Sequence, residues 1–175
     1  MKHSILAIVV LSACGSNGST EDWTKAKTKQ YRETVEGVTF SIEMPEGRTG
    51  RPDTQQSGWD YWLSDARGYS PTAAISVRSY ADVLDDDLEY RRLKSDGDVV
   101  AVESFENGYA YTAKDRDGYS AFVVLNLGEH KSIACRAIAG NLPIDKQVAA
   151  KLPALEAICR TLQVDGIGVV RAKSA

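Results

Sequence analysis

Short runs in which apolar and polar residues alternate, separated by turn-forming residues, restrict the fold of this chain more than any other feature. An alternation with a period of two gives each strand one apolar face. Asp117 and Gly118 stand between two such runs, and Asp-Gly at that place is a strong hairpin signal. The pattern therefore predicts an antiparallel sheet of about six or seven strands. The runs are Val38–Pro45, Trp59–Leu63, Thr72–Tyr80, Val99–Phe105, Tyr109–Lys114, Tyr119–Leu127 and Lys131–Ala139.

Two further segments are typical of helices. Asp82–Lys94 carries acidic residues in its early turns and basic residues in its last turn, which is the charge order that a helix dipole favours. Ile144–Leu162 carries an apolar stripe at helical spacing. Pro153 interrupts this stripe without shifting its phase, so a kinked helix and two abutting helices both fit. We therefore expect an α+β fold in which two helices cover the antiparallel sheet.

The N-terminus has the parts of a secretory signal, namely Lys2, the apolar run Ile5–Leu11 and small residues after it. The run is too short to cross a bilayer, which takes roughly 20 apolar residues as a helix. The stretch LSAC at Leu11–Cys14 resembles a bacterial lipobox. The resemblance implies cleavage before Cys14 and attachment of lipid to its thiol. An ordinary signal with an accidental cysteine and a first core strand are the alternatives.

These patterns divide the chain into a signal at residues 1–13, a lipidated polar tether at residues 14–36 and a single domain at residues 37–175. The end of the domain from residue 165 is a candidate flexible tail. Acyl chains on Cys14 would hold the protein on a membrane, so we expect a location in the cell envelope. Gly15 after the cysteine indicates, by resemblance to lipoprotein sorting, the outer membrane facing the periplasm where the source is a diderm. The net charge of −3 gives no electrostatic footprint for nucleic acid.

The three cysteines support an exported protein. Acylation of Cys14 would leave Cys135 and Cys159 as an even pair in an oxidising compartment. Cys135 lies on the apolar face of a predicted strand, and Cys159 lies on the apolar stripe of the final helix. Both sulfurs are therefore expected to face one core and to form a disulfide. Two buried free thiols are the alternative.

Residues that usually carry catalysis are scarce. His130 is the only histidine that would remain after removal of the signal, and its odd separation from Cys135 places the two side chains on opposite faces of a strand. Asp85–Asp87 fits the first turns of a helix better than a metal site. We expect no catalytic residue, no metal and no cofactor. An envelope enzyme that hydrolyses glycan or cell wall with a pair of carboxylates is the alternative.

Aromatic residues are concentrated on two of the predicted strands. Trp59 and Tyr61 share one side of the first strand, and Tyr109 and Tyr111 share one side of the other. Such residues anchor protein interfaces, and they also pack across neighbouring strands. These four residues are the candidate surface for a protein partner, with structural packing as the alternative.

Two patterns resemble those of PsbP-like domains. VTFSIEMP at Val38–Pro45 is similar to the first strand of that family, and ALEAICRTL at Ala154–Leu162 is similar to its closing helix. The resemblance implies an α/β/α sandwich and accessory binding or assembly work without chemistry, with an unidentified envelope protein as the partner. An immunity protein against an exported toxin is an alternative within the same binding class.

Overall fold

The computed structural model describes residues 23–48, 50–53, 55, 57–63, 73–80, 98–115, 118–129, 131–139 and 151–170. These residues are mostly β-strand and form two antiparallel sheets. The 3₁₀ helix η1 (Trp23–Lys25) precedes the first strand, and the α-helix α3 (Leu152–Cys159) precedes the last. The strands are β1 (Thr28–Val35), β2 (Val38–Pro45), β3 (Gly50–Asp53), β4 (Gly58–Trp62), β5 (Ala73–Tyr80), β6 (Asp98–Phe105), β7 (Gly108–Asp115), β8 (Gly118–Gly128), β9 (Lys131–Ala139) and β10 (Gln163–Val164).

The larger sheet has seven strands in the order β3-β4-β5-β9-β8-β7-β6. Strands β6 to β9 form a meander in which each strand pairs with its neighbour in sequence. β5 pairs with β9 and so joins this meander to β4 and β3. Six of the seven strands predicted from alternation lie in this sheet. The first predicted strand, β2, belongs to the other sheet.

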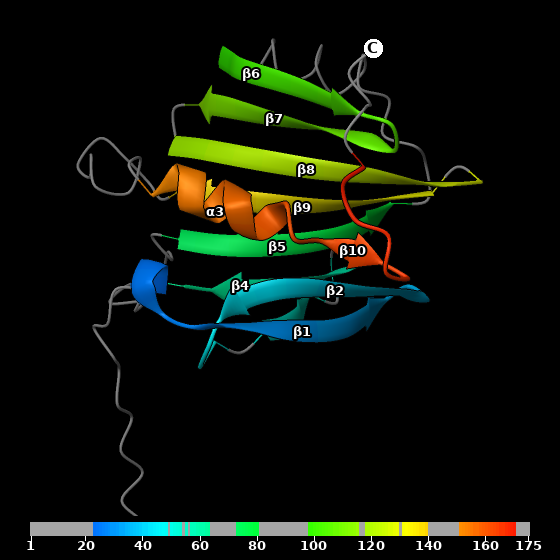
Figure 1. Cartoon of the computed structure of the whole chain (residues 1–175), viewed down its shortest axis with the longest axis horizontal. Helices are drawn as coiled ribbons and strands as arrows, with labels where there is room; N and C mark the ends of the chain where they lie inside the picture. The colour runs from blue at the N-terminus through cyan, green and yellow to red at the C-terminus, as the bar shows by residue number, and fades with distance from the viewer. Residues whose placement is uncertain are drawn as a thin grey trace, which may run out of the picture.

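The smaller sheet has the order β1-β2-β10. Glu36 and Gly37 form the two-residue turn between β1 and β2, and their φ values are 48° and 78°. A type I′ turn needs positive φ at both positions, and glycine adopts it without a steric penalty. This sheet and α3 together cover one face of the seven-stranded sheet (Figure 1). We call the covered face the inner face and the opposite one the outer face.

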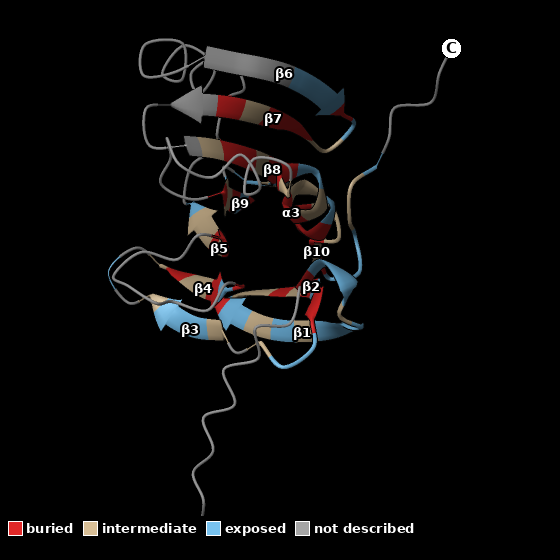
Figure 2. Ribbon diagram, turned by 90° about the vertical axis from the view of Figure 1, so that its left-hand side faces the viewer, coloured by how far each residue is buried: buried red, intermediate tan, exposed pale blue. Residues whose placement is uncertain are grey.

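The hydrophobic core lies between the two sheets and under α3, where Figure 2 shows the buried residues. Phe40, Ile42 and Met44 enter it from β2, and none of them is more than 1% exposed. Each such side chain stabilises the fold by roughly 1.5–3 kcal/mol through burial. The largest residues that the inner face supplies are Tyr61, Ile75, Val77, Val123, Leu125 and Ile133.

The expected α+β sandwich with two covering helices is wrong. β2 lies outside the main sheet because it pairs along its whole length with β1, which occupies part of the expected tether. Residues 23–36 of the expected tether therefore belong to the fold, and Trp23 among them is 5% exposed. In the described ranges α3 is the only α-helix, and the helix predicted at Asp82–Lys94 lies outside them. Two stacked antiparallel sheets with one helix replace the α/β/α layers.

In the described residues the final helix is shorter than the helix that the apolar stripe at Ile144–Leu162 predicts. Pro153 lies in the first turn of α3, where the missing N–H donor of a proline has no intrahelical partner to lose. It therefore belongs to a helix start and does not kink a described helix. The part of the predicted helix before Lys151 lies outside the described residues. No helix in the described ranges is long and apolar enough to span a membrane.

Candidate functional site

Cys135 on β9 and Cys159 on α3 form a disulfide whose two Cα atoms are 5.3 Å apart. This is the pair that the sequence predicts. Both cysteines are fully buried, and α3 packs on β9 and β8 at this point. The bridge therefore fastens the helix to the centre of the inner face. Disulfides in such positions are characteristic of proteins that work in oxidising compartments.

The two aromatic residues of β4 that the sequence places in the candidate surface, Trp59 and Tyr61, pack against the core. Tyr61 is 0% exposed and packs edge-on against Tyr31, with ring centroids 6.0 Å apart. Trp59 is half-buried beside Tyr61 and donates a hydrogen bond from Nε1 to the carbonyl of Thr34. Both residues therefore lie between the sheets and tie β4 to β1. The interface prediction is wrong for Tyr61 because β1 covers it.

The aromatic residues on β7 lie on the outer face, so the four predicted residues do not form one surface. Tyr109 and Tyr111 are 3% and 5% exposed. Tyr111 stacks on Phe122 of β8 with ring centroids 4.4 Å apart. The interface prediction fails for Tyr109 and Tyr111 as well, because both side chains are buried. Alternation shows which residues of one strand point to the same side. It does not show whether residues of two different strands lie on the same face of the sheet.

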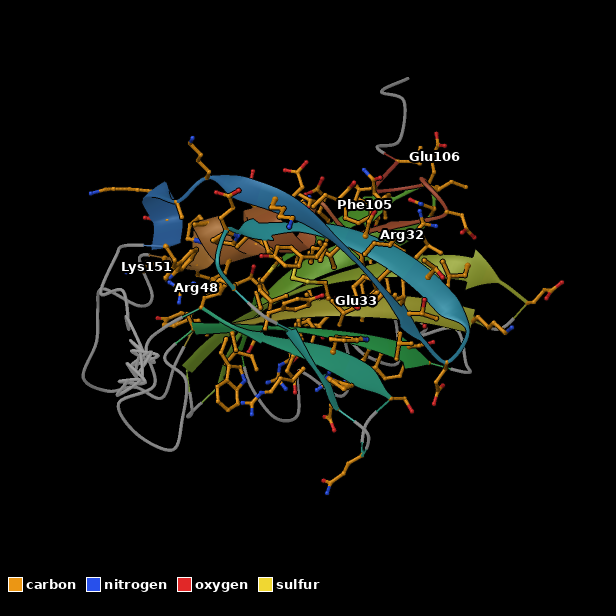
Figure 3. All side chains as sticks on the ribbon, turned by 90° about the horizontal axis from the view of Figure 1, so that it is seen from below. Arg32, Glu33, Arg48, Phe105, Glu106 and Lys151 are labelled. Carbon is orange, nitrogen blue, oxygen red and sulfur yellow. A yellow bond between two sulfur atoms is a disulfide. The ribbon has the colours of Figure 1, made fainter. Side chains whose placement is uncertain are left out.

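A carboxylate points into the space between the sheets. Glu33 follows Tyr31 by two residues on the inward side of β1, and Figure 3 shows it between β1 and the larger sheet. Burial raises the pKa of the Tyr61 hydroxyl, and the nearby charge of Glu33 raises it further. Burial also raises the pKa of Glu33. β1 is an edge strand, and an inward charge on an edge strand discourages pairing with a further chain.

A cleft of about 410 Å³ opens at the end of the molecule opposite η1, and we call it the distal cleft. η1 precedes β1 and the Glu36–Gly37 turn follows it, so about 26 Å of strand separates the two ends. Figure 3 shows Lys151 and Arg48 at the η1 end and Glu106 at the other. The rim includes the side chains of Asn107 and Asn126. Its apolar lining residues are Val38, Leu125, Leu127, Val164 and Ile167.

The segment that follows α3 forms one wall of the distal cleft. It pairs with β2 through β10 and then turns back at an isolated bridge between Val164 and Ile167. Asn107, in the β6–β7 turn, holds its far end by donating from Nδ2 to the carbonyl of Gly168 at 2.9 Å and accepting at Oδ1 from the Val170 N–H at 3.1 Å. The candidate flexible tail from residue 165 is therefore bound to the domain as far as Val170.

The distal cleft has no local sequence signal. Its lining comes from the β1–β2 turn, the β6–β7 turn, β8 and the segment after α3. One feature of the sequence does fit the arrangement in retrospect, since Ile167 and Val170 are apolar residues that follow the last helix. Ile167 is 61% exposed, which is unusual for a side chain of its size.

The described residues bring together no obvious chemistry. No group of three or more His, Cys, Asp or Glu side chains in these ranges is placed to hold a metal ion. His130, Asp85–Asp87 and the predicted lipidation site Cys14 lie outside the described residues. Neither a protein-family model nor a curated protein matches the chain. The candidate site is therefore defined by geometry alone, as a cleft at the end of the molecule opposite its N-terminal helix. Its lining is mixed, because Thr39 and Asp165 lie among the apolar residues.

Proposed function

We propose that the protein is a lipid-anchored accessory protein of the cell envelope that holds a partner protein at its distal cleft. The observation that carries the proposal is the position of the cleft, whose lining residues include the β1–β2 turn. Figure 1 shows that this turn and η1 lie at opposite ends of β1. A chain attached to a membrane through Cys14 would reach the domain at Trp23. The cleft would then face away from the membrane surface and be open to partners.

The distance between lipid and domain supports this orientation. Trp23 lies nine positions after Cys14 in the chain, and a fully extended chain of that length spans about 30 Å. The tether is therefore comparable in length to β1, so the domain would stay close to the membrane. The buried disulfide agrees with the oxidising compartment that such a lipoprotein would occupy.

The lining of the cleft favours an extended apolar segment of a partner protein. Val38, Leu127 and Ile167 offer apolar contact, and the amide side chains of Asn107 and Asn126 stand at the rim. Exposed apolar side chains framed by polar groups are typical of interaction sites. Asn107 already holds the wall of the cleft in place, so binding would need little ordering of the protein.

The anchor and the cleft can be tested separately in the native host. Replacement of Cys14 by Ser should move the protein from the membrane fraction or leave it unprocessed. Ile167→Glu should abolish copurification of the partner with the tagged full-length protein, because it replaces an exposed apolar side chain by a second acidic residue in a lining that already holds Asp165. Val102→Glu is the matched control, since Val102 is 50% exposed on β6 and does not line the cleft. Equal loss with both variants would contradict the assignment of the cleft.

A further inference from the structure

Two exposed arginines on the outer face of the larger sheet are stacked on aromatic rings. The guanidinium carbon of Arg51 lies 3.9 Å from the ring centroid of Trp62, and that of Arg136 lies 5.2 Å from the ring centroid of Phe122. In the described part of the chain neither arginine forms an ion pair. Arg136 donates one long hydrogen bond, from Nη2 to Ser120 Oγ at 3.5 Å. Stacking on a ring leaves the other in-plane N–H donors of a guanidinium available for a carboxylate or a phosphate.

The two arginines stand on one row of residues that crosses the sheet. Arg51 pairs in register with Asp60, Asp60 with Ser76, and Ser76 with Arg136. Residues directly opposite each other on neighbouring strands share one face of a sheet. Three strand intervals separate the arginines, which corresponds to about 14 Å between their Cα atoms.

The acidic residues near this row are already neutralised. Arg78 on β5 forms ion pairs with Asp60 at 2.7 Å and with Asp53 at 3.0 Å. Ser76 donates a further hydrogen bond to Asp60 at 2.6 Å. The carboxylates between the arginines are thus engaged by donors from β5, so they repel an approaching anion less than free carboxylates would. The positive charges of Arg51 and Arg136 are left to attract one.

We propose that this outer-face row binds an acidic glycan, meaning a polysaccharide that carries carboxylate or phosphate groups. The Cα atoms of the two arginines are about 14 Å apart, and each guanidinium is held on a ring of its own. A chain with charges on separate sugar units suits two such separated cations better than one small anion does. Trp62 is 43% exposed beside Arg51 and offers a flat apolar surface for a sugar ring. The two arginines can each form a charge-assisted hydrogen bond with an acidic group of the glycan, and Trp62 can pack against one of its sugar rings.

A glycan fits the row better than a nucleic acid does. Nucleic-acid binding rests on the neutralisation of many closely spaced phosphates, and the chain has a net charge of −3. The row has two arginines that form no ion pair with the described residues, and they lie three strands apart. This arrangement suits a polymer whose charges are farther apart than those of a nucleic acid. The proposal concerns a different surface from the distal cleft, so each can stand or fall without the other.

Titration calorimetry on the full-length protein in detergent tests the proposal with defined probes. Oligogalacturonate supplies carboxylates, phosphomannan supplies phosphates, dextran is the uncharged control and oligothymidylate represents nucleic acid. We expect one of the two acidic glycans to bind and dextran not to bind. Arg51→Gln and Arg136→Gln should each weaken that binding about tenfold, as the loss of a charge-assisted contact does, and the double variant about a hundredfold if the sites are additive.

Arg32→Gln is the matched control, because it removes the same charge from an exposed position on β1 in the other sheet. It should leave the affinity unchanged. Trp62→Ala should weaken binding while leaving the melting temperature near that of the wild type. Absence of binding to both acidic glycans, or an equal effect of Arg32→Gln, would overturn the proposal. Tighter binding of oligothymidylate with the same dependence on Arg51 and Arg136 would replace the glycan by a nucleic acid.

Discussion

The two faces of the larger sheet come from the same seven strands but carry different side chains. The inner face is apolar across β5, β9 and β8, and Ile75, Val123 and Ile133 are fully buried there. The outer face carries ion pairs between β5 and the β3–β4 pair, and exposed arginines on β3 and β9. On β7 and β8 it also holds a second buried cluster, which includes Tyr109 and Val124. The inner face therefore packs along its whole length, whereas the outer face has exposed positions only at part of the sheet. Those exposed positions can vary with less effect on stability, and we expect binding functions there.

The largest effect should come from emptying the inner core. Phe40→Ala removes a side chain that is 1% exposed at the centre of β2, and such a deletion costs about 3–5 kcal/mol because it leaves a cavity. Urea unfolding of both variants gives the comparison. Trp62→Ala on the outer face should cost less than about 1 kcal/mol. Similar losses of stability in the two variants would contradict the difference between the core and the exposed part of the outer face.

Loss of the disulfide should have the second largest effect on stability. The bridge between Cys135 and Cys159 closes a loop with a sequence separation of 24, and the chain-entropy model gives about 3 kcal/mol for a loop of this size. For a domain of this length that corresponds to a fall of about 10 °C in the melting temperature. Calorimetry with and without reductant measures it. Two titratable thiols in denatured protein purified without reductant would contradict the bridge.

A smaller effect should separate the two kinds of arginine on the outer face. Arg78→Met leaves Asp53 and Asp60 without their partner, and their side chains are 21% and 29% exposed. We expect the free energy of unfolding to fall by about 1–2 kcal/mol. The loss is moderate because a partly exposed carboxylate that has lost its partner is still solvated by water. Arg51→Met is the matched control and should stay within about 0.5 kcal/mol of the wild type. Equal losses would mean that Arg51 is structural too.

The smallest effect concerns the pH dependence of stability. The pKa of Tyr61 is raised above its ordinary value of 10.0 by burial and by the charge of Glu33. Above pH 10 the unfolded chain therefore loses this proton while the folded chain keeps it, so stability falls as the pH rises. Tyr61→Phe should remove that part of the fall. At pH 7 it should be close to neutral, because the hydroxyl has no hydrogen-bond partner among the described residues.

Unfolding curves at pH 7 and above pH 10 measure the Tyr61→Phe effect. Tyr31→Phe is a graded comparison, because Tyr31 touches Tyr61 from the other sheet and is the last of the three causes that raise the pKa of Tyr61. It should reduce the alkaline fall in stability less than Tyr61→Phe does. A wild-type alkaline fall that persists unchanged in Tyr61→Phe would exclude Tyr61 as its source.

Six of the seven strands of the larger sheet could be predicted from the sequence, because apolar and polar residues alternate along them. β3 was missed because it is a short edge strand without apolar residues. The disulfide could be predicted because each cysteine lies on the apolar side of its element. Cys135 follows the period of a strand, and Cys159 follows the period of a helix. β1 was missed because charged residues stand at Lys29, Arg32 and Glu33. An edge strand with one solvated face tolerates these charges, and they made the segment resemble a linker.

The surfaces could not be predicted, for two physical reasons. The side of a strand that faces the core is decided by what packs on it, so Tyr61 and Tyr111 ended on opposite faces of one sheet. The distal cleft joins segments that are far apart in sequence, and Asn107 meets Gly168 across 61 positions. The outer-face row likewise depends on register between four strands, which a sequence pattern does not specify.

The central claim is that the distal cleft holds a partner while the lipid anchors the opposite end. Photo-crosslinking in living cells tests it most directly, with a photoreactive amino acid at Ile167 in the cleft or at Val102 outside it. We expect that Ile167 gives a discrete crosslink to one envelope protein, that Val102 gives none, and that Cys14→Ser removes the crosslink. No crosslink from Ile167, or the same products from both positions, would contradict it.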